Sequence, residues 1–338
     1  MSIGSATLTE VASKQSLPDL RYSSSDGKTI FYQNHSGELL YATNYKVQQV
    51  LKSKAVRNTD YQVTVSPHKI FAAITQDEHV HDFLSLRKEK NIYLIKIGST
   101  NPELINQGIA PQLHLQDTWL SYYRPVQKTL VIRGISNPNK EYQIQLSNNL
   151  NPYFIPQVIM PSEDTVLYTD INNSGLMGLL QYDFTKNTVT PILKTASPLE
   201  KIEICANDST AFIGLFGINR SSLGSAITAY NFKKNAFADR KIIYESKNND
   251  PGNLKCQSSG NLYFVKNEAK DNNSTEQYAV AEIAYNLNQD GITTAKLLTP
   301  VDAHNQLIEM DGKIFLESLG KYFLLHGDNN LGKDLWAK

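Results

Sequence analysis

Two segments of the chain, Pro111-Gln-Leu-His-Leu-Gln116 and Pro156-Gln-Val-Ile-Met-Pro161, begin in the same way and lie 45 residues apart. After a short turn, each continues into a second run of β-branched and aromatic residues, Thr118-Trp-Leu-Ser-Tyr122 and Thr165-Val-Leu-Tyr-Thr169. Runs of this kind, bounded by turn residues, are typical of β-strands. The two segments therefore indicate an internal repeat that opens with a strand, a turn and a second strand.

The same pattern recurs along the whole chain. Its first strands begin near Leu20, Val63, Leu113, Val158, Ile202, Leu254 and Leu307, at intervals of 43, 50, 45, 44, 52 and 53 residues. A four-stranded blade of a β-propeller takes about 40–50 residues, and each repeat supplies further apolar runs for a third and a fourth strand. We therefore predict an all-β fold, a single seven-bladed β-propeller of four-stranded antiparallel blades. It is expected to cover residues 1–338, with blades starting near residues 19, 62, 112, 157, 201, 253 and 306.

The last repeat lacks an obvious fourth strand. The segment Ala6-Thr-Leu-Thr-Glu-Val-Ala12 precedes the first repeat and reads like the outer strands that precede first strands elsewhere. We predict that residues 6–12 complete the last blade, which removes the free sheet edge between the first and last blades. The alternative is that Asp334-Leu-Trp-Ala337 takes this place.

The turns between first and second strands resemble a known repeat. Asp26-Gly27-Lys28-Thr-Ile-Phe31, Ser66-Pro67-His68-Lys69-Ile-Phe71 and Asp311-Gly312-Lys313-Ile-Phe315 are similar to the Ser-Pro-Asp-Gly-Lys motif of TolB-like, WD40-like (PD40-type) β-propellers. The resemblance covers residues 19–326 and implies the propeller fold. Because Asp-Gly supports the hairpin turn itself, the motif says little about function.

Charge and composition exclude several classes of partner. Lys and Arg number 33, as do Asp and Glu, so the formal net charge is zero and no basic stripe is present. Nucleic-acid binding is therefore not expected, and no apolar run reaches the roughly 18 residues that would insert into a membrane. The N-terminus lacks a signal-peptide pattern, so the protein is expected to be cytoplasmic, or periplasmic or secreted if a leader has been removed.

Three connections are long, and we expect all of them on one face of the propeller: residues 76–90, 217–225 and 266–277. Long loops on a rigid scaffold are where function usually lies, and the chain carries no catalytic motif such as Gly-x-Ser-x-Gly. The predicted function is recognition of a protein or peptide partner, without enzymatic activity and without a cofactor. The residues predicted to bind the partner are Asp77, Glu78, His79, His81, Asp82, Phe83, Leu84, Phe216, Arg220 and Leu223. The apolar residues among them could instead pack the loops against the rest of the protein.

A second hypothesis is an enzyme, either a metal-dependent lyase or a lactonase-type hydrolase acting on a small carbohydrate derivative in the axial pocket. His35, His79, His81 and His304 could meet on one face and hold a divalent transition metal. Some lyases related to TolB-like repeats use a histidine-bound metal in this place. The simpler interpretation is four solvated loop histidines. A third hypothesis is a scaffold within a larger assembly.

Three smaller features complete the candidates. His114 alternates with leucines and is expected to be packed or to line the channel. The Asp170-Ile-Asn172-Asn-Ser174-Gly175 segment resembles the opening of a calcium loop, but Gln181 stands where a glutamate is needed, so a hairpin turn is expected. Cys205 and Cys256 occupy matching places on neighbouring first strands; two free buried thiols are expected, with a disulfide left open.

Overall fold

The computed structural model describes residues 9–13, 20–23, 29–33, 38–43, 46–51, 60–65, 68, 70–77, 89–99, 101–147, 154–207, 209–217, 224–231, 241–257, 259–269, 277–285, 292–301, 305–310, 313–318 and 321–325. Within these ranges every regular element is a β-strand. The chain divides into two compact units. The N-terminal unit comprises residues 12–156, and the C-terminal unit comprises residues 157–338 together with residues 1–11.

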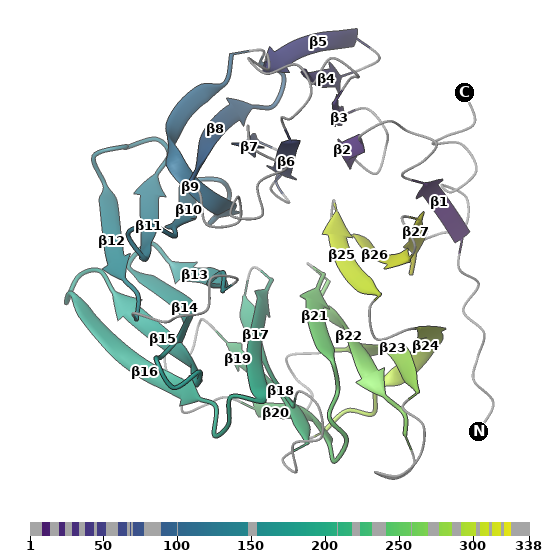
Figure 1. Cartoon of the computed structure of the whole chain (residues 1–338). Coiled ribbons are helices and arrows are strands. Elements are labelled where there is room, and N and C mark those ends of the chain that lie inside the picture. The colour runs from purple at the N-terminus through teal and green to yellow at the C-terminus, as the bar shows by residue number, and fades with distance from the viewer. Residues whose placement is uncertain are drawn as a thin grey trace. The chain divides into compact units, whose positions relative to one another are not determined.

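The C-terminal unit is built from four-stranded sheets in which strands that follow one another in the chain lie side by side (Figure 1). The first contains β13 (Val158–Ser162), β14 (Thr165–Ile171), β15 (Met177–Asp183) and β16 (Thr188–Lys194). The second contains β17 (Glu200–Ala206), β18 (Thr210–Gly217), β19 (Ser225–Asn231) and β20 (Lys241–Ser246). The third contains β21 (Gly252–Cys256), β22 (Asn261–Asn267), β23 (Tyr278–Ala284) and β24 (Lys296–Val301).

The last sheet combines the two ends of the chain. Its order is β1 (Thr9–Ser13), β27 (Lys321–Leu324), β26 (Lys313–Ser318) and β25 (Gln306–Met310). The strand β1 overlaps the predicted segment of residues 6–12 and ends one residue later. The first residues of that segment and the alternative segment, residues 334–337, lie outside the described residues.

The N-terminal unit contains a four-stranded sheet and a seven-stranded one. The first consists of β2 (Leu20–Ser23), β3 (Thr29–Gln33), β4 (Leu39–Thr43) and β5 (Lys46–Leu51). The second runs through β6 (Asp60–Val65), β7 (Phe71–Asp77), β8 (Lys90–Lys96), β9 (Glu103–His114), β10 (Trp119–Arg124), β11 (Thr129–Gly134) and β12 (Glu141–Gln145).

The seven-stranded sheet corrects the expectation that all blades are separate sheets of four strands. The 12-residue β9 pairs with β8 through residues 103–108 and with β10 through residues 109–114. It therefore acts as the outer strand of one repeat and the first strand of the next. The reason is the absence of any connecting loop between these two strands, and the chain turns within β9 at Ala110, which has a φ of 50°.

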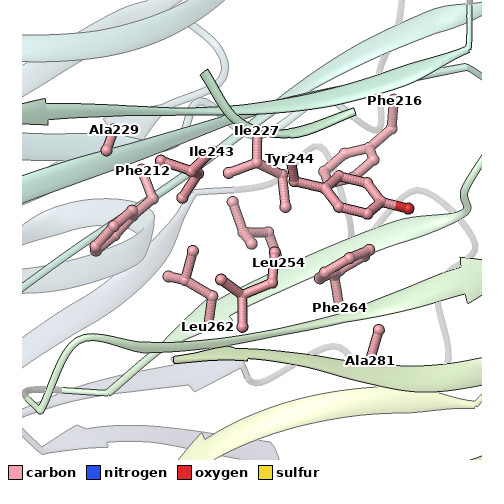
Figure 2. Packing of buried hydrophobic residues seen from close by; sticks show 11 residues of the cluster. Phe212, Phe216, Ile227, Ala229, Ile243, Tyr244, Leu254, Leu262, Phe264 and Ala281 are labelled. Atoms are coloured by element: carbon pink, nitrogen blue, oxygen red, sulfur yellow. The ribbon is translucent and has the colours of Figure 1, made fainter. Parts of the chain in front are cut away.

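The strands β2, β13, β17, β21 and β25 begin within two residues of Leu20, Val158, Ile202, Leu254 and Leu307, and each pairs in antiparallel register with the strand that follows it. Successive sheets pack face to face through apolar clusters inside each unit. In the C-terminal unit the largest side chains of one cluster, Phe212, Phe216, Tyr244 and Phe264, come from β18, β20 and β22 and surround Leu254 (Figure 2). Burial of each such side chain contributes about 2–3 kcal/mol.

Candidate functional site

Most of the predicted partner-binding and metal-binding residues lie outside the described part of the chain. These are Glu78, His79, His81, Asp82, Phe83, Leu84, Arg220, Leu223, His35 and His304. Asp77 is the last residue of β7, and Phe216 is the last but one of β18. The described residues therefore include the strand ends to which the long loops are attached.

Phe216 lies in the core and is not a surface anchor. Its ring is 0% exposed and packs against the ring of Phe264 at a centroid distance of 6.2 Å. The ring also covers Gly252, where an added Cβ would stand 2.7 Å from it. Phe216 lies on the same face of β18 as Phe212, and both rings enter the same apolar cluster, so Phe216 packs the base of the loop that follows it.

In the C-terminal unit, one buried carboxylate lies between the bases of two long loops. The side chain of Asp250 is 0% exposed. Its Oδ1 accepts a hydrogen bond of 2.9 Å from the backbone N–H of Asn267, and its Oδ2 accepts one of 2.8 Å from the hydroxyl of Tyr244. Asn267 ends β22 and begins the connection to β23. The carboxylate thus fixes the start of the predicted recognition loop at residues 266–277.

The second loop, residues 217–225, is attached to the same network. The backbone N–H of Asp250 donates to Oγ of Ser225 at 2.9 Å, and this hydroxyl donates to the carbonyl of Asn248 at 3.1 Å. Asn248 in turn donates from Nδ2 to the carbonyls of Asn267 and Ala269, both at 2.9 Å. Since Ser225 begins β19, the end of one loop and the start of the other share one set of buried and partly buried hydrogen bonds.

The electrostatics of this network centre on Asp250. Burial raises the pKa of its carboxyl to about 6, against the hydrogen bonds from Asn267 and Tyr244 and the charge of Lys266, which lower it. Burial and the neighbouring Asp250 raise the pKa of Tyr244. Lys266 is paired with Glu268. At neutral pH the network therefore holds an ionised carboxylate whose two donors are a phenol and a backbone amide.

In the N-terminal unit, the end of loop 76–90 is held differently. Glu89, which directly precedes β8, forms an ion pair of 3.4 Å with Arg124 at the end of β10. The arginine side chain is 25% exposed. Arg124 is therefore paired with a carboxylate in this structure.

His114 is packed, as its alternation with leucines predicts. Its Nε2 lies 2.7 Å from Oγ of Ser121, and burial lowers its pKa to about 4. The imidazole is therefore neutral at neutral pH. A serine beside a neutral histidine suggests a nucleophile and its base. Ser121 is only 1% exposed, however, so we interpret this hydrogen bond as part of the packing between β9 and β10.

The candidate calcium loop is a hairpin turn. Oδ1 of Asn172 accepts hydrogen bonds from the backbone N–H groups of Ser174 (2.9 Å) and Leu176 (3.0 Å), and Gly175 adopts a positive φ of 76°. The side-chain oxygen that would bind calcium is thus used by the turn itself.

Across the residues that the structure describes, no group of three or more His, Cys, Asp or Glu side chains is arranged to hold a metal ion. Nor does this part of the chain contain a helix that is long and apolar enough to cross a membrane.

Sequence reasoning missed the Asp250 network. In the sequence, Asn248-Asn-Asp250-Pro-Gly252 has the composition of an ordinary solvated turn. The signal that could have identified it is positional: this turn links an outer strand to the next first strand, at the same ends of the sheets as both long loops.

Comparison with known proteins supports the fold. No family model matches the chain, and no curated protein matches it. Among solved structures, an oligogalacturonate lyase in complex with manganese is similar at 11% identity and a TM-score of 0.56, over 97% of this chain and 95% of that one. The β-propeller domain of Myceliophteria thermophila Cps50 (Swd1) has 10% identity and a TM-score of 0.51, with coverage of 92% and 97%.

A prolyl endopeptidase has 12% identity and a TM-score of 0.55 over 90% of this chain; the chain spans about half of that protein, 49% of its length. At these identities the likeness concerns the fold alone. Together with the antiparallel four-stranded sheets, it places the chain, at the level of the fold, among β-propeller proteins.

Proposed function

We propose that this protein is a non-enzymatic recognition module for a protein or peptide. In this proposal it is a seven-bladed β-propeller closed by its N-terminal strand, and it binds its partner with the long loops of one face. The observation that carries the proposal is the shared anchor of loops 217–225 and 266–277. Buried and partly buried hydrogen bonds join Ser225, Asn248, Asp250 and Asn267. Loops with a rigid common base lose less entropy on binding than loops that move independently.

The proposed contact residues are those of the loops themselves. Asp77, Glu78, His79, His81, Asp82, Phe83 and Leu84 belong to the first loop, and Arg220 and Leu223 to the second. Phe83, Leu84 and Leu223 would supply apolar contacts, and the charged residues would set specificity at the rim. The zero net charge argues against polyanionic partners.

The test compares the wild-type chain with three variants for capture of proteins from the native host's lysate, followed by binding to the purified captured protein. In the first variant a short Gly-Ser turn replaces residues 78–88, and in the second it replaces residues 218–223. The control is Lys186→Ala in the exposed turn between β15 and β16, at the opposite ends of the strands. Loss of at least ten-fold in affinity in a folded loop variant, with the control unchanged, supports the proposal; equal binding by all forms overturns it.

The alternative function, a metal-dependent lyase or lactonase-type enzyme acting on a small carbohydrate derivative, rests on the segment from Asp77 to Asp82 with His79 and His81. It would need a polar axial pocket with convergent histidines and carboxylates. Metal analysis of the purified protein distinguishes it. Stoichiometric metal that is lost in the double variant His79→Ala/His81→Ala would favour the enzyme over the recognition module.

A further inference from the structure

The chain has only two cysteines, and the fold brings them together. Cys205 lies near the end of β17, and Cys256 is the last residue of β21. Both strands belong to the C-terminal unit, are the first strands of successive sheets, and pack side by side (Figure 1). Cys205 and Cys256 pack against the same apolar cluster, although the residues are 51 positions apart in the sequence.

The alternation of β17 determines where Cys205 points. Ile202 and Ile204 of this strand enter the cluster shared with β13 and β14, whereas Cys205 packs against the cluster shared with β20 and β22. Glu203, two residues before Cys205, also reaches β21, since its Oε2 accepts a hydrogen bond of 2.6 Å from the N–H of Leu254. Glu203 and Cys205 thus face the same neighbouring strand.

The neighbouring strand β21 has the same two-residue spacing. Leu254 and Cys256 are two residues apart, and both contact the cluster that Cys205 contacts. The pairs Glu203–Leu254 and Cys205–Cys256 are therefore successive cross-links between the same two strands. A disulfide needs its two Cα atoms within about 7 Å, and residues of β17 and β21 have Cα atoms within 8 Å of one another.

Both cysteines are free, and each residue is only partly covered by its neighbours. We propose that Cys205 and Cys256 are a reversible modification site, which a small-molecule disulfide such as oxidised glutathione converts into an intramolecular disulfide between neighbouring sheets. The inference is independent of the proposed recognition function.

The reaction proceeds by two thiol–disulfide exchanges. One protein thiolate attacks a sulfur of the reagent, forms a mixed disulfide and releases one thiolate, which takes up a proton. The second protein thiolate then attacks the protein-bound sulfur of the mixed disulfide, forms the Cys205–Cys256 bond and releases the second small thiol. The two protein thiols are oxidised by two electrons, and the reagent is reduced to two thiols.

The environment also predicts the rate. Burial and the neighbouring Cys256 raise the pKa of the Cys205 thiol well above its ordinary value. Because the thiolate is the nucleophile, the formation of the disulfide is expected to be slow at neutral pH and to accelerate as the pH rises.

The test incubates the full-length protein with mixtures of reduced and oxidised glutathione, with and without urea, and measures free thiols, intact mass and non-reducing electrophoretic mobility. The expected product has lost both thiols and two hydrogen atoms, carries no glutathione and remains a monomer. Its equilibrium constant of formation should be at least ten-fold larger in the folded protein than in urea. The variants Cys205→Ser and Cys256→Ser should each stop at the mixed disulfide.

Three results would overturn the proposal. They are a stable glutathione adduct on the wild-type protein, a disulfide-linked dimer, and an equilibrium constant no larger in the folded than in the unfolded chain. None of these measurements needs a binding partner, so failure here and failure of the recognition proposal remain distinguishable.

Discussion

Each unit contains a buried aspartate that accepts two hydrogen bonds, but the two aspartates act at opposite ends of the strands. Asp117, in the turn between β9 and β10, accepts from the backbone N–H groups of Ile70 and Phe71 at 3.0 and 3.1 Å. Asp250 accepts from Asn267 and Tyr244 beside the long loops. In the N-terminal unit, the buried carboxylate thus fastens a short turn, and the end of the long loop depends on the partly exposed ion pair of Glu89 and Arg124.

The two units therefore differ in how firmly the bases of their long loops are held. Removing a buried carboxylate that accepts two hydrogen bonds destabilises the folded state, because both donors are left without an acceptor. A partly exposed ion pair contributes little, since water replaces it readily. We therefore expect loops 217–225 and 266–277 to have firmer bases than loop 76–90.

The largest effect is expected from removing the buried carboxylates. Asp250→Ala should lower the free energy of unfolding by about 3–4 kcal/mol, because it leaves two buried donors without an acceptor. Asp117→Ala should lower it by about 2–3 kcal/mol, because its two donors are only partly buried. Urea unfolding measures this. Amide hydrogen exchange should separate the two variants: only Asp250→Ala should accelerate exchange at Asn267. The matched control is Asp164→Ala in an exposed turn, with a change within about 0.5 kcal/mol; a loss below 1 kcal/mol for Asp250→Ala would break the comparison.

The pH dependence of stability should isolate the carboxyl of Asp250. Its pKa is raised in the folded protein from 3.8 to about 6, so the folded state binds more protons than the unfolded state between these values. Stability from this group is therefore greatest below pH 3.8 and is lost as the pH rises to about 6, by at most about 3 kcal/mol. The difference in unfolding free energy between wild type and Asp250→Asn, measured from pH 3.5 to 7 at about 0.5 intervals, should change in this window. A constant difference would show that burial does not raise this pKa.

Two glycines allow backbone strain to be separated from packing. Gly252 has a φ of 82°, and a Cβ there would stand 2.7 Å from the Phe216 ring and 3.0 Å from Oε2 of Glu203. Gly98 has a φ of 90° with nothing within 4 Å of such a Cβ. Gly98→Ala should cost about 1 kcal/mol of strain, and Gly252→Ala about 2–3 kcal/mol because a clash is added. Equal losses in thermal or urea unfolding would mean that the Phe216 ring moves aside freely.

The smallest effect is expected at the ion pair. Arg124→Gln should lower the free energy of unfolding by less than about 1 kcal/mol, and the loss should shrink further at high salt. Urea unfolding at low and high ionic strength checks this. A loss above about 2 kcal/mol that is independent of salt would place Arg124 in the same class as the buried aspartates.

The strands could be predicted from the sequence because each one carries its own signal. The runs around Val158, Ile202 and Leu254 alternate and end in turn residues, and this local pattern is sufficient to place β13, β17 and β21. The joining of two sheets through β9 could not be predicted in this way. It depends on the absence of a loop between residues 108 and 109, and the sequence pattern on either side is that of two ordinary strands.

The candidate site was less predictable than the fold. The lengths of the loops point to one face, but the anchors at Asp250 and Ser225 depend on hydrogen bonds between residues 25 positions apart. Phe216 shows the same limit: its neighbours along the chain suggest a loop anchor, whereas the glycine at position 252 leaves room for its ring in the core. Contacts between repeats decide both cases, and no local pattern encodes them.

The continuous strand β9 has a consequence for how the chain can be cut and rejoined. A break within residues 103–114 removes hydrogen-bonded partners from β8 and β10 at once, so new termini there would disturb two repeats. A break in the exposed turn at residues 185–187 falls between two strands of a single sheet. Permuted or split versions of this protein should therefore tolerate termini in that turn and fail when they are placed inside β9.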